Sequence, residues 1–356
     1  MQAVLTVDLS AIAANWRALC ARHPGGAVAG VVKADAYGLG AAPVARALLA
    51  AGCRHFFVAH LAEGLAVREA IGPGPMIAVL NGFAPGADGE AGLVPVLNGL
   101  PNVAAYAAAA RARGQAMPAI LHVDTGMSRL GLDARELDLL AEDPGRLAGL
   151  DLLYVMTHLA CADEPEHPLN ATQAARFRAA CARLPPAPRS LANSSGIFLG
   201  PDFASDLARP GCALYGINPT PGAPNPMRQV VRLQAPVLQI REVPEGASLG
   251  YGATWTAPRA SRIATVAAGY ADGYLRALSG RGTGIIAGRA VPLVGRVSMD
   301  LITFDVTDAP GLAPGDMIEL IGPGNTPDDL AARAGTIGYE ILTSLGARYR
   351  REYRTS

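Results

Sequence analysis

Short apolar segments and segments with helical periodicity alternate along the first 215 or so residues, and this alternation restricts the fold more than any other feature of the chain. Apolar strands joined by helices pair in parallel, through right-handed crossovers. About eight such units in roughly 220 residues favour a TIM-type (β/α)₈ barrel over an open sheet. No GxGxxG motif follows the first strand, which argues against a dinucleotide-binding fold. Strands are expected at 27–32, 55–59, 76–80, 93–96, 117–123, 152–156, 189–191 and 213–215, and helices at 10–22 (with Ser10 as a candidate cap), 42–51, 62–70, 103–113, 134–141 and 171–183.

The pattern breaks at residues 216–226, where four prolines and two glycines fall within eleven residues. Such a segment cannot sustain a helix or a central strand, so it marks a domain boundary. We therefore expect a barrel over residues 1–222 and a mainly β domain over residues 223–356, where β-type patterns alternate with glycine and proline turns. The strands of the second domain are expected at 230–243, 262–267, 284–287, 291–306 and 317–320, with one helix at 326–334.

Composition argues against several functional classes. The chain carries 30 basic and 30 acidic residues, so its net charge of zero gives no electrostatic footprint for nucleic acid or for an acidic membrane. No uninterrupted apolar stretch is long enough to span a bilayer, and the N-terminus lacks the basic region of a secretory signal. Five cysteines are scattered without CxxC spacing, which is typical of free thiols in a reducing compartment. We expect a cytoplasmic protein without a metal site.

Lys33 is the only lysine of the chain, and every other basic position is an arginine. A guanidinium stays protonated and is no nucleophile, whereas a lysine amine can lose its proton and form a Schiff base. A lysine kept by chance would more often be a solvated surface residue. Lys33 instead ends the apolar run 27–32 and opens the glycine-bearing loop 34–40, which indicates a chemical role.

Polar side chains follow several of the expected strands at the point where each strand ends. In a barrel these positions share the carboxyl-terminal face, where active sites are built. Each position alone is a weak signal, since a single histidine is more often structural, but together they converge on one mouth. The positions are Lys33, 124–129, His158, 193–196 and 209–212.

The same mouth offers donors to a phosphate group. Ser194, Ser195 and the backbone N–H groups of Gly211 and Cys212 are the short polar groups and N–H donors that such anions favour. A Schiff-base lysine beside a phosphate cradle points to pyridoxal phosphate, whose ring serves as an electron sink for carbanions.

Nine motifs of the chain resemble those of the alanine racemase family. They run in the family's order over nearly the whole chain and across both expected domains, so the resemblance is highly specific. The motifs are VKADAYG at 32–38, DTGMSRLG at 124–131, TH at 157–158, NS at 193–194, RPG at 209–211, LGYGAT at 249–254, GYADGY at 269–274, GRVSMD at 295–300 and TIGYE at 336–340.

The resemblance implies a pyridoxal-phosphate-dependent racemase that interconverts L- and D-alanine. It also implies a homodimer in which each active site is completed by the β domain of the partner subunit. Lys33 would hold the cofactor as a Schiff base and act as the base on one face of the substrate. Tyr251, from the other subunit, would be the base on the opposite face.

The resemblance also assigns binding residues around the cofactor and the substrate. The groups that would hold the phosphate are the side chains of Tyr37, Ser194 and Tyr339 and the N–H groups of Gly211 and Cys212. His158 would lie beside the cofactor ring, and Arg209 would face the pyridine nitrogen. Arg129 and the Met299 N–H would receive the substrate carboxylate, with Tyr270 at the mouth.

The residue types suit a racemisation, which removes a proton from one face and returns one to the other, so two bases must flank a planar carbanion. Tyr251 has a reference pKa of about 10, so positive groups such as His158 and the arginines must favour its phenolate. Arg209 cannot readily give a proton to the ring nitrogen, which weakens the electron sink and disfavours transamination. Bulky tyrosines at the mouth leave space for a methyl group rather than a long side chain.

Two positions depart from the family pattern. His122 stands two residues before Asp124, where the family commonly has a carbamylated lysine that steadies the following arginine. Arg129 would therefore need another anion or a neutral contact. Leu39 occupies the place of a usual histidine, with a mild expected effect.

Other functions stay open at this point. A non-catalytic pyridoxal-phosphate-binding barrel would end near residue 230, whereas this chain continues and carries Tyr251. A decarboxylase would place an acid at the ring nitrogen in place of Arg209, and a Schiff-base aldolase would need no phosphate cradle. The nearest alternative is a broad-specificity or serine-preferring amino-acid racemase. The sequence leaves open whether the activity serves cell-wall synthesis or alanine catabolism.

Overall fold

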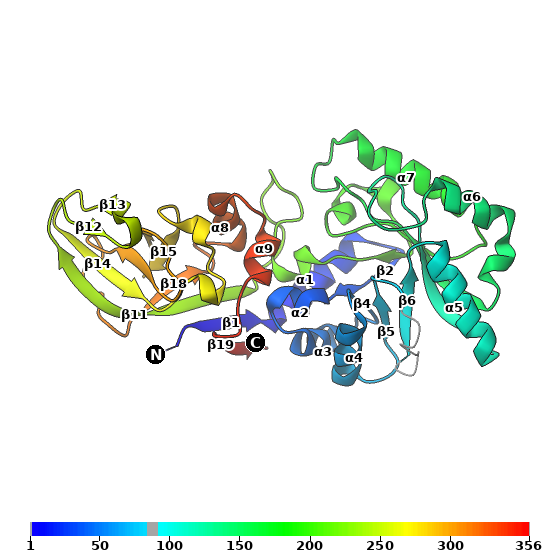
Figure 1. The fold of residues 1–356 in the computed structure, drawn as a ribbon, viewed down its shortest axis with the longest axis horizontal. Helices are drawn as coiled ribbons and strands as arrows, with labels where there is room; N and C mark the ends of the chain where they lie inside the picture. Colours follow the sequence, from blue (N-terminus) through cyan, green and yellow to red (C-terminus); the bar gives the residue numbers. More distant parts are fainter. Residues whose placement is uncertain (1, 84–91, 356) are drawn as a thin grey trace.

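The computed structural model describes residues 2–83 and 92–355. The chain forms an α/β barrel and a mainly β part that lies on one side of it (Figure 1). The first strand, β1 (Val4–Asp8), and the last, β19 (Arg350–Arg354), lie side by side at the lower edge of the β part, toward the barrel (Figure 1).

Seven parallel strands of the barrel follow one another in chain order, from β3 to β9. They are β3 (Gly30–Val31), β4 (His55–Val58), β5 (Met76–Val79), β6 (Leu93–Leu97), β7 (Met117–His122), β8 (Leu150–Met156) and β9 (Arg189–Ser190), and the closing pair is β2 (Ala27–Val28) and β10 (Leu207–Ala208), also parallel. Only Ala29 separates β2 from β3, and its N–H donates to the carbonyl of Ala208 at 2.8 Å. The N–H of Arg209 donates to the carbonyl of Ala192, just beyond β9, at 2.8 Å. These bonds close the sheet into the expected barrel.

Helices cover the outside of the barrel (Figure 1). They are α1 (Leu9–Arg22), α3 (Ala41–Ala51), α4 (Leu61–Ile71), α5 (Leu100–Arg113), α6 (Ala134–Glu142) and α7 (Pro168–Cys181). α1 precedes the first barrel strand and packs beside α3 and β2, so it covers the closing pair of strands. Among the residues that the structure describes, no helix is both long and apolar enough to cross a membrane.

Two expectations for the barrel are wrong. Residues 213–215 lie in the 3₁₀ turn η5 (Cys212–Tyr215), and the last barrel strand is β10. A short buried apolar run cannot be distinguished from a strand by its pattern alone, and here the Tyr215 hydroxyl ties the turn to the barrel by donating to the Val31 carbonyl at 2.8 Å. The cap of α1 is Asp8, whose carboxylate accepts from the N–H of Ala11 at 2.8 Å, while the hydroxyl of Ser10 donates to Asp8.

The strand β11 (Val231–Val243) organises the mainly β part. It pairs antiparallel with β18 (Met317–Ile321), β14 (Ser261–Val266) and β1 (Val4–Asp8). On its other edge β1 pairs in parallel with β19 (Arg350–Arg354). The two ends of the chain therefore join one sheet, and neither β1 nor β19 was expected from the sequence.

The expected strand at 291–306 is in fact two strands. β16 (Arg289–Pro292) pairs with β15 (Thr283–Ile286), and β17 (Ile302–Asp305) pairs with β14. The loop between them carries the GRVSMD motif, and Gly295 there has φ +71°, a conformation that favours glycine and turns the chain. The remaining elements are β12 (Ser248–Leu249), β13 (Trp255–Thr256), α8 (Pro327–Ala334) and α9 (Gly338–Thr343).

The two parts share one hydrophobic core. Leu5 of β1 belongs to the same buried cluster as Leu39 of the barrel. α9 packs against the segment α2 (Lys33–Gly38), and a Cβ on Gly38 would come within 2.5 Å of the carbonyl oxygen of Leu342. The β part is therefore packed closely against the turn that carries the lysine.

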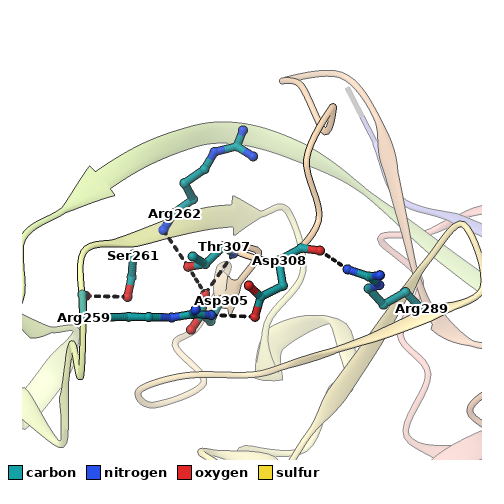
Figure 2. A network of polar contacts seen from close by, with 7 residues as sticks. All are labelled: Arg259, Ser261, Arg262, Arg289, Asp305, Thr307 and Asp308. Atoms are coloured by element: carbon teal, nitrogen blue, oxygen red, sulfur yellow. Dashed lines mark hydrogen bonds and ion pairs between the residues drawn. The ribbon is translucent and has the colours of Figure 1, made fainter.

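A polar network fastens one edge of the β part (Figure 2). The Arg259 guanidinium pairs with the carboxylate of Asp308 at 2.5 Å, and Arg289 donates to the carbonyl of Asp308. The N–H of Thr307 donates to the carboxylate of Asp305 at 3.0 Å. Because exposed ion pairs add little stability, the main effect of this network is to order the turn that follows β17.

Candidate active site

A cavity of about 610 Å³ opens at the carboxyl ends of the barrel strands. The residues that line it come from loops far apart in the sequence, which parallel strands bring to one face. Nine of the twelve residues that the resemblance assigns to the site lie in its wall: Lys33, Tyr37, Arg129, His158, Ser194, Arg209, Gly211, Cys212 and Tyr339. Ser195, the other predicted phosphate donor, lines the cavity too.

Lys33 begins α2, a single turn of unusual geometry rather than the expected open loop. Ala34 to Tyr37 all have positive φ, between 51° and 57°, so the turn is left-handed. The amine of Lys33 lies in the cavity wall, half-buried. Burial lowers its pKa, the charge of Arg129 lowers it further, and the carboxylate of Glu63 raises it. The amine is therefore easier to deprotonate than a solvated lysine.

Hydroxyl and N–H groups gather at one end of the cavity. The Ser194 hydroxyl oxygen accepts from the N–H groups of Gly211 at 3.0 Å and Ala213 at 3.3 Å. The Cys212 thiol and the Tyr339 hydroxyl belong to residues that line the same cavity. Such a cluster of short polar donors is suited to the oxygens of a phosphate.

Glycine at position 211 is required by a close approach of Tyr37. A Cβ on Gly211 would come within 2.1 Å of the Tyr37 hydroxyl oxygen. Tyr37 cannot easily move aside, because its ring stacks on Tyr215 with centroids 4.7 Å apart and meets Tyr339 edge-on at 6.2 Å. The tyrosine hydroxyl is thus held over the Gly211 backbone, beside the donors to the expected phosphate.

Arg209 is buried in the wall of the cavity. It donates to the carbonyl of Thr157 at 2.5 Å and to the hydroxyl of Ser190. Burial lowers its pKa to about 10, so it stays a cation at neutral pH. A guanidinium has only hydrogen-bond donors and no acceptor, so it suits contact with an unprotonated ring nitrogen.

His158 differs from its expected charge. Burial, followed by the charges of Arg209, Arg129 and Lys33, lowers its pKa to about 3. The ring is neutral near neutral pH, so His158 cannot supply the positive charge that was expected to favour a tyrosinate. Among the groups considered for that role, the arginines remain.

His122 also lies in the cavity wall and is neutral. Its Nδ1 is 2.7 Å from the side-chain oxygen of Asn98. Burial first, then the charges of Arg209 and Arg129, lower the pKa of His122 to about 4. The position therefore offers Arg129 an uncharged neighbour in place of an anion.

Three predicted residues do not reach this cavity. Tyr251, Tyr270 and Met299 lie on the β part of the chain, with 73%, 42% and 54% of their surfaces exposed. Tyr270 and Met299 are close to each other, because the N–H of Tyr270 donates to Ser298 and the N–H of Ala271 to Met299, both at 3.0 Å. Within one chain, these side chains are not part of the cavity wall.

Other residues at the site were missed by sequence reasoning. Asn81 lines the cavity and Asn98 holds His122; each follows a barrel strand by one or two residues, so the strand-exit rule applies to them too. Asp163 lines the cavity from the loop after β8. Glu63 lies in the first turn of α4, where an acidic residue is common, so its sequence position gave no signal.

Both halves of the chain match one protein family, and proteins of this family are similar to the chain over nearly its whole length. The family described as "Alanine racemase, N-terminal domain" matches residues 7–219, and "Alanine racemase, C-terminal domain" matches residues 230–353. An alanine racemase of Rhodospirillum rubrum is 58% identical over 357 residues, which cover 99% of this chain and 96% of that protein. One of Acidiphilium cryptum is 59% identical over 355 residues, covering 98% and 97%. A crystal structure of alanine racemase from Bartonella henselae with covalently bound pyridoxal phosphate is 42% identical, covers 99% of both chains and has a TM-score of 0.96.

Proposed function

The chain belongs to the alanine racemase family, whose members are pyridoxal-phosphate-dependent isomerases, and from this premise we propose how its own residues divide the reaction. The activity is the interconversion of L- and D-alanine. The observation that carries the assignment of roles is the cavity in which the only lysine of the chain lies together with a polar phosphate cradle and a buried arginine.

The proposed cofactor contacts follow from two sets of residues in the cavity wall, one suited to the phosphate and one to the ring. Bound pyridoxal phosphate supplies an electron sink for a carbanion at the substrate α-carbon. The hydroxyls of Tyr37, Ser194 and Tyr339 and the N–H groups of Gly211 and Cys212 would hold the phosphate, because these residues lie together in the cavity wall. Arg209, which stays a cation, would donate toward the ring nitrogen and keep it unprotonated, and neutral His158 would lie beside the ring.

Lys33 is the proposed base on one face of the substrate. Its amine opens into the cavity, and its lowered pKa favours the neutral form that can accept a proton. Arg129, in the same wall, binds the substrate carboxylate. Met299 lies outside the cavity of its own chain, so the second donor would be the backbone N–H of the partner subunit's Met299. Arginine suits this task because its planar guanidinium matches a carboxylate.

Tyr251 is the proposed base on the opposite face, acting in the active site of a second copy of the chain. It is 73% exposed on the β part and does not line the cavity of its own chain. Met299, Leu301 and Ile337 are also exposed apolar side chains of this part. An exposed aromatic and apolar surface supports a homodimer in which the partner subunit's Tyr251 enters the cavity and meets its arginines.

Two further proposals concern the organisation of the chain. We assign residues 1–222 to the cofactor-binding barrel and residues 223–356 to the β domain. Although β1 lies within residues 1–222, it belongs to the sheet of the β domain. A cytoplasmic location is supported by the five cysteines, all of which are free thiols.

A racemisation assay over a panel of L-amino acids tests the proposed specificity. Alanine is expected to give the highest kcat/KM, and L-serine a lower one, since the partner subunit's Tyr251 would leave space for a methyl group rather than for a longer side chain. A higher kcat/KM for serine, or comparable values for long side chains, would replace this proposal with a serine-preferring or broad-specificity racemase.

A further inference from the structure

The backbone turn that carries Lys33 is strained. Ala34, Asp35, Ala36 and Tyr37 adopt the left-handed conformation in succession. In a residue with a Cβ this conformation brings the Cβ close to the following carbonyl oxygen, so it normally occurs in isolated residues. Four in a row persist only where the surrounding structure determines them. The direction of the Lys33 side chain depends on this turn, because Lys33 is the residue directly before it.

One carboxylate outside the turn contacts its first amide. Oε1 of Glu63 accepts from the N–H of Ala34 at 2.7 Å. Oε2 of the same group accepts from the N–H of Ala59 at 2.7 Å and from that of His60 at 3.1 Å. Glu63 belongs to the first turn of α4, and α2 lies beside α3 and α4 (Figure 1). Its carboxylate thus joins the strained turn to the loop between β4 and α4.

We propose that Glu63 is a positioning residue for Lys33: its carboxylate holds the left-handed turn in place and so aims the lysine amine into the cavity. Hydrogen bonds from N–H groups to a carboxylate are stronger than those between neutral groups, and here they share one rigid acceptor. The inference rests on the proposed role of Lys33 as cofactor-binding residue and base.

The charge of Glu63 acts on the same amine. The Lys33 pKa is lowered by burial and by Arg129, and Glu63 is the anion that opposes them. The neighbouring acid Asp35 has a different task, since its carboxylate accepts from the N–H of Ala41 at 2.6 Å and joins the turn to the first residue of α3. Glu63 is therefore the contact at which the geometry and the charge of Lys33 are set together.

Glu136 provides a matched control elsewhere in the barrel. It also lies in the first turn of a helix, α6, and its two carboxylate oxygens accept from the N–H groups of Leu100 at 2.9 Å and Asp133 at 3.3 Å. It joins two segments in the same way as Glu63, but it does not line the cavity or act on Lys33. Glu63→Gln and Glu136→Gln therefore remove comparable helix-cap interactions.

The test compares the two variants by measurements that do not require turnover. Hydrogen–deuterium exchange of peptides spanning 33–40 should become roughly tenfold faster in Glu63→Gln, as expected for the loss of a hydrogen bond to a charged group. In the full-length chain freed of cofactor, acylation of the only lysine should have its midpoint at lower pH, because the stabilising anion is gone. Release of pyridoxal phosphate from the holoenzyme should become faster, by up to about 10²-fold. Glu136→Gln should leave all three unchanged.

The outcomes separate positioning from simple helix capping. If Glu63→Gln matches the wild type in exchange at 33–40 and in lysine acylation, or if Glu136→Gln alters them equally, Glu63 is only a cap and the proposal is wrong. If Glu63→Gln does not fold, Glu63→Asp replaces it: it keeps the charge on a shorter side chain, so the acylation midpoint should stay near that of the wild type while peptides 33–40 exchange faster. Unchanged exchange in a folded Glu63→Asp likewise overturns the proposal.

A separate measurement shows whether the proposed role of Lys33 as the cofactor lysine is wrong. If borohydride leaves no pyridoxyl group on Lys33 in the wild-type holoenzyme, the assignment of the cofactor lysine fails. Both hydrogen–deuterium exchange and lysine acylation can be measured on the full-length chain freed of cofactor, so they still decide whether Glu63 positions Lys33.

Discussion

The side-chain amide of Asn98 fixes the tautomer of His122. Asn98 Nδ2 donates to the carbonyls of Leu80 at 2.8 Å and Val96 at 3.2 Å, so its Oδ1 is the atom that faces His122 Nδ1 at 2.7 Å. An amide oxygen can only accept, so the hydrogen lies on Nδ1 and Nε2 carries the free lone pair. A neutral imidazole with Nε2 as acceptor therefore stands at the position where the family commonly has a negatively charged lysine derivative.

Acid should destabilise the fold through this histidine. The folded pKa of His122, about 4, lies below the reference value of about 6.5. The unfolded chain thus binds a proton first as pH falls, so this contribution to stability is complete above about pH 6.5 and is lost as pH falls toward about 4. The loss is about 3 kcal/mol in this window. Urea unfolding of the wild type and of His122→Leu at several pH values should show a shallower decline in the variant; parallel curves would contradict it.

Bicarbonate should not affect activity. No lysine is present at position 122 and no other lysine exists apart from Lys33, so no carbamate can form beside Arg129. Racemisation rates measured in buffers with and without bicarbonate, at matched pH and ionic strength, should coincide. A reproducible rise in rate with bicarbonate would show that an anion is recruited to this position.

Borohydride reduction of the yellow holoprotein should label one lysyl peptide, the one that contains Lys33. The amine lies in the cavity wall and the chain offers no second lysine to compete. Peptide mass spectrometry after proteolysis gives the site directly. Recovery of unmodified Lys33 with the pyridoxyl group elsewhere would exclude it as the cofactor lysine.

Tyr251→Phe should remove proton abstraction from L-alanine while cofactor stays bound and the α-proton of D-alanine still exchanges with solvent. Loss of one positioned base should lower racemisation roughly 10²–10⁴-fold. The measurement is the solvent exchange of each enantiomer, followed by NMR, beside the racemisation rate. A normal rate in the variant would show that Tyr251 is not a base.

Mixing inactive Lys33→Ala and Tyr251→Phe subunits tests whether the active site is shared between the two subunits of a dimer. Because Tyr251 would act in the partner subunit, a mixed dimer has one site that lacks both bases and one intact site. Activity should therefore return when mixed dimers form. Mixed dimers that stay inactive would show that the active site is not shared across an interface.

Gly211→Ala should weaken cofactor binding. The new Cβ would come within 2.1 Å of the Tyr37 hydroxyl, and Tyr37 is held by its stacking on Tyr215. Overpacking of this kind costs about 1–3 kcal/mol, or roughly 5- to 150-fold in a dissociation constant. Equilibrium titration with pyridoxal phosphate measures the change. Gly324→Ala is the control, since its Cβ would meet no atom nearer than 3.4 Å; equal weakening in both variants would contradict the explanation.

All of the expected barrel strands except the last, and the polar residues that follow them, could be predicted from the sequence; the last strand is β10, in place of residues 213–215. Parallel strands with helical crossovers leave a strong periodic pattern, and their carboxyl ends share one face whatever the exact register. Lys33, His158, Ser194 and Arg209 could therefore be predicted to converge, and they line one cavity.

Features that depend on contacts between distant segments could not be predicted from the sequence. β1 and β19 are strands because β11 lies beside β1, and the left-handed turn of residues 34–37 persists because Glu63 and other neighbours hold it. Local propensity predicts neither. The charge of His158 was likewise missed, since burial and neighbouring cations set its pKa, and both arise only when the barrel has closed.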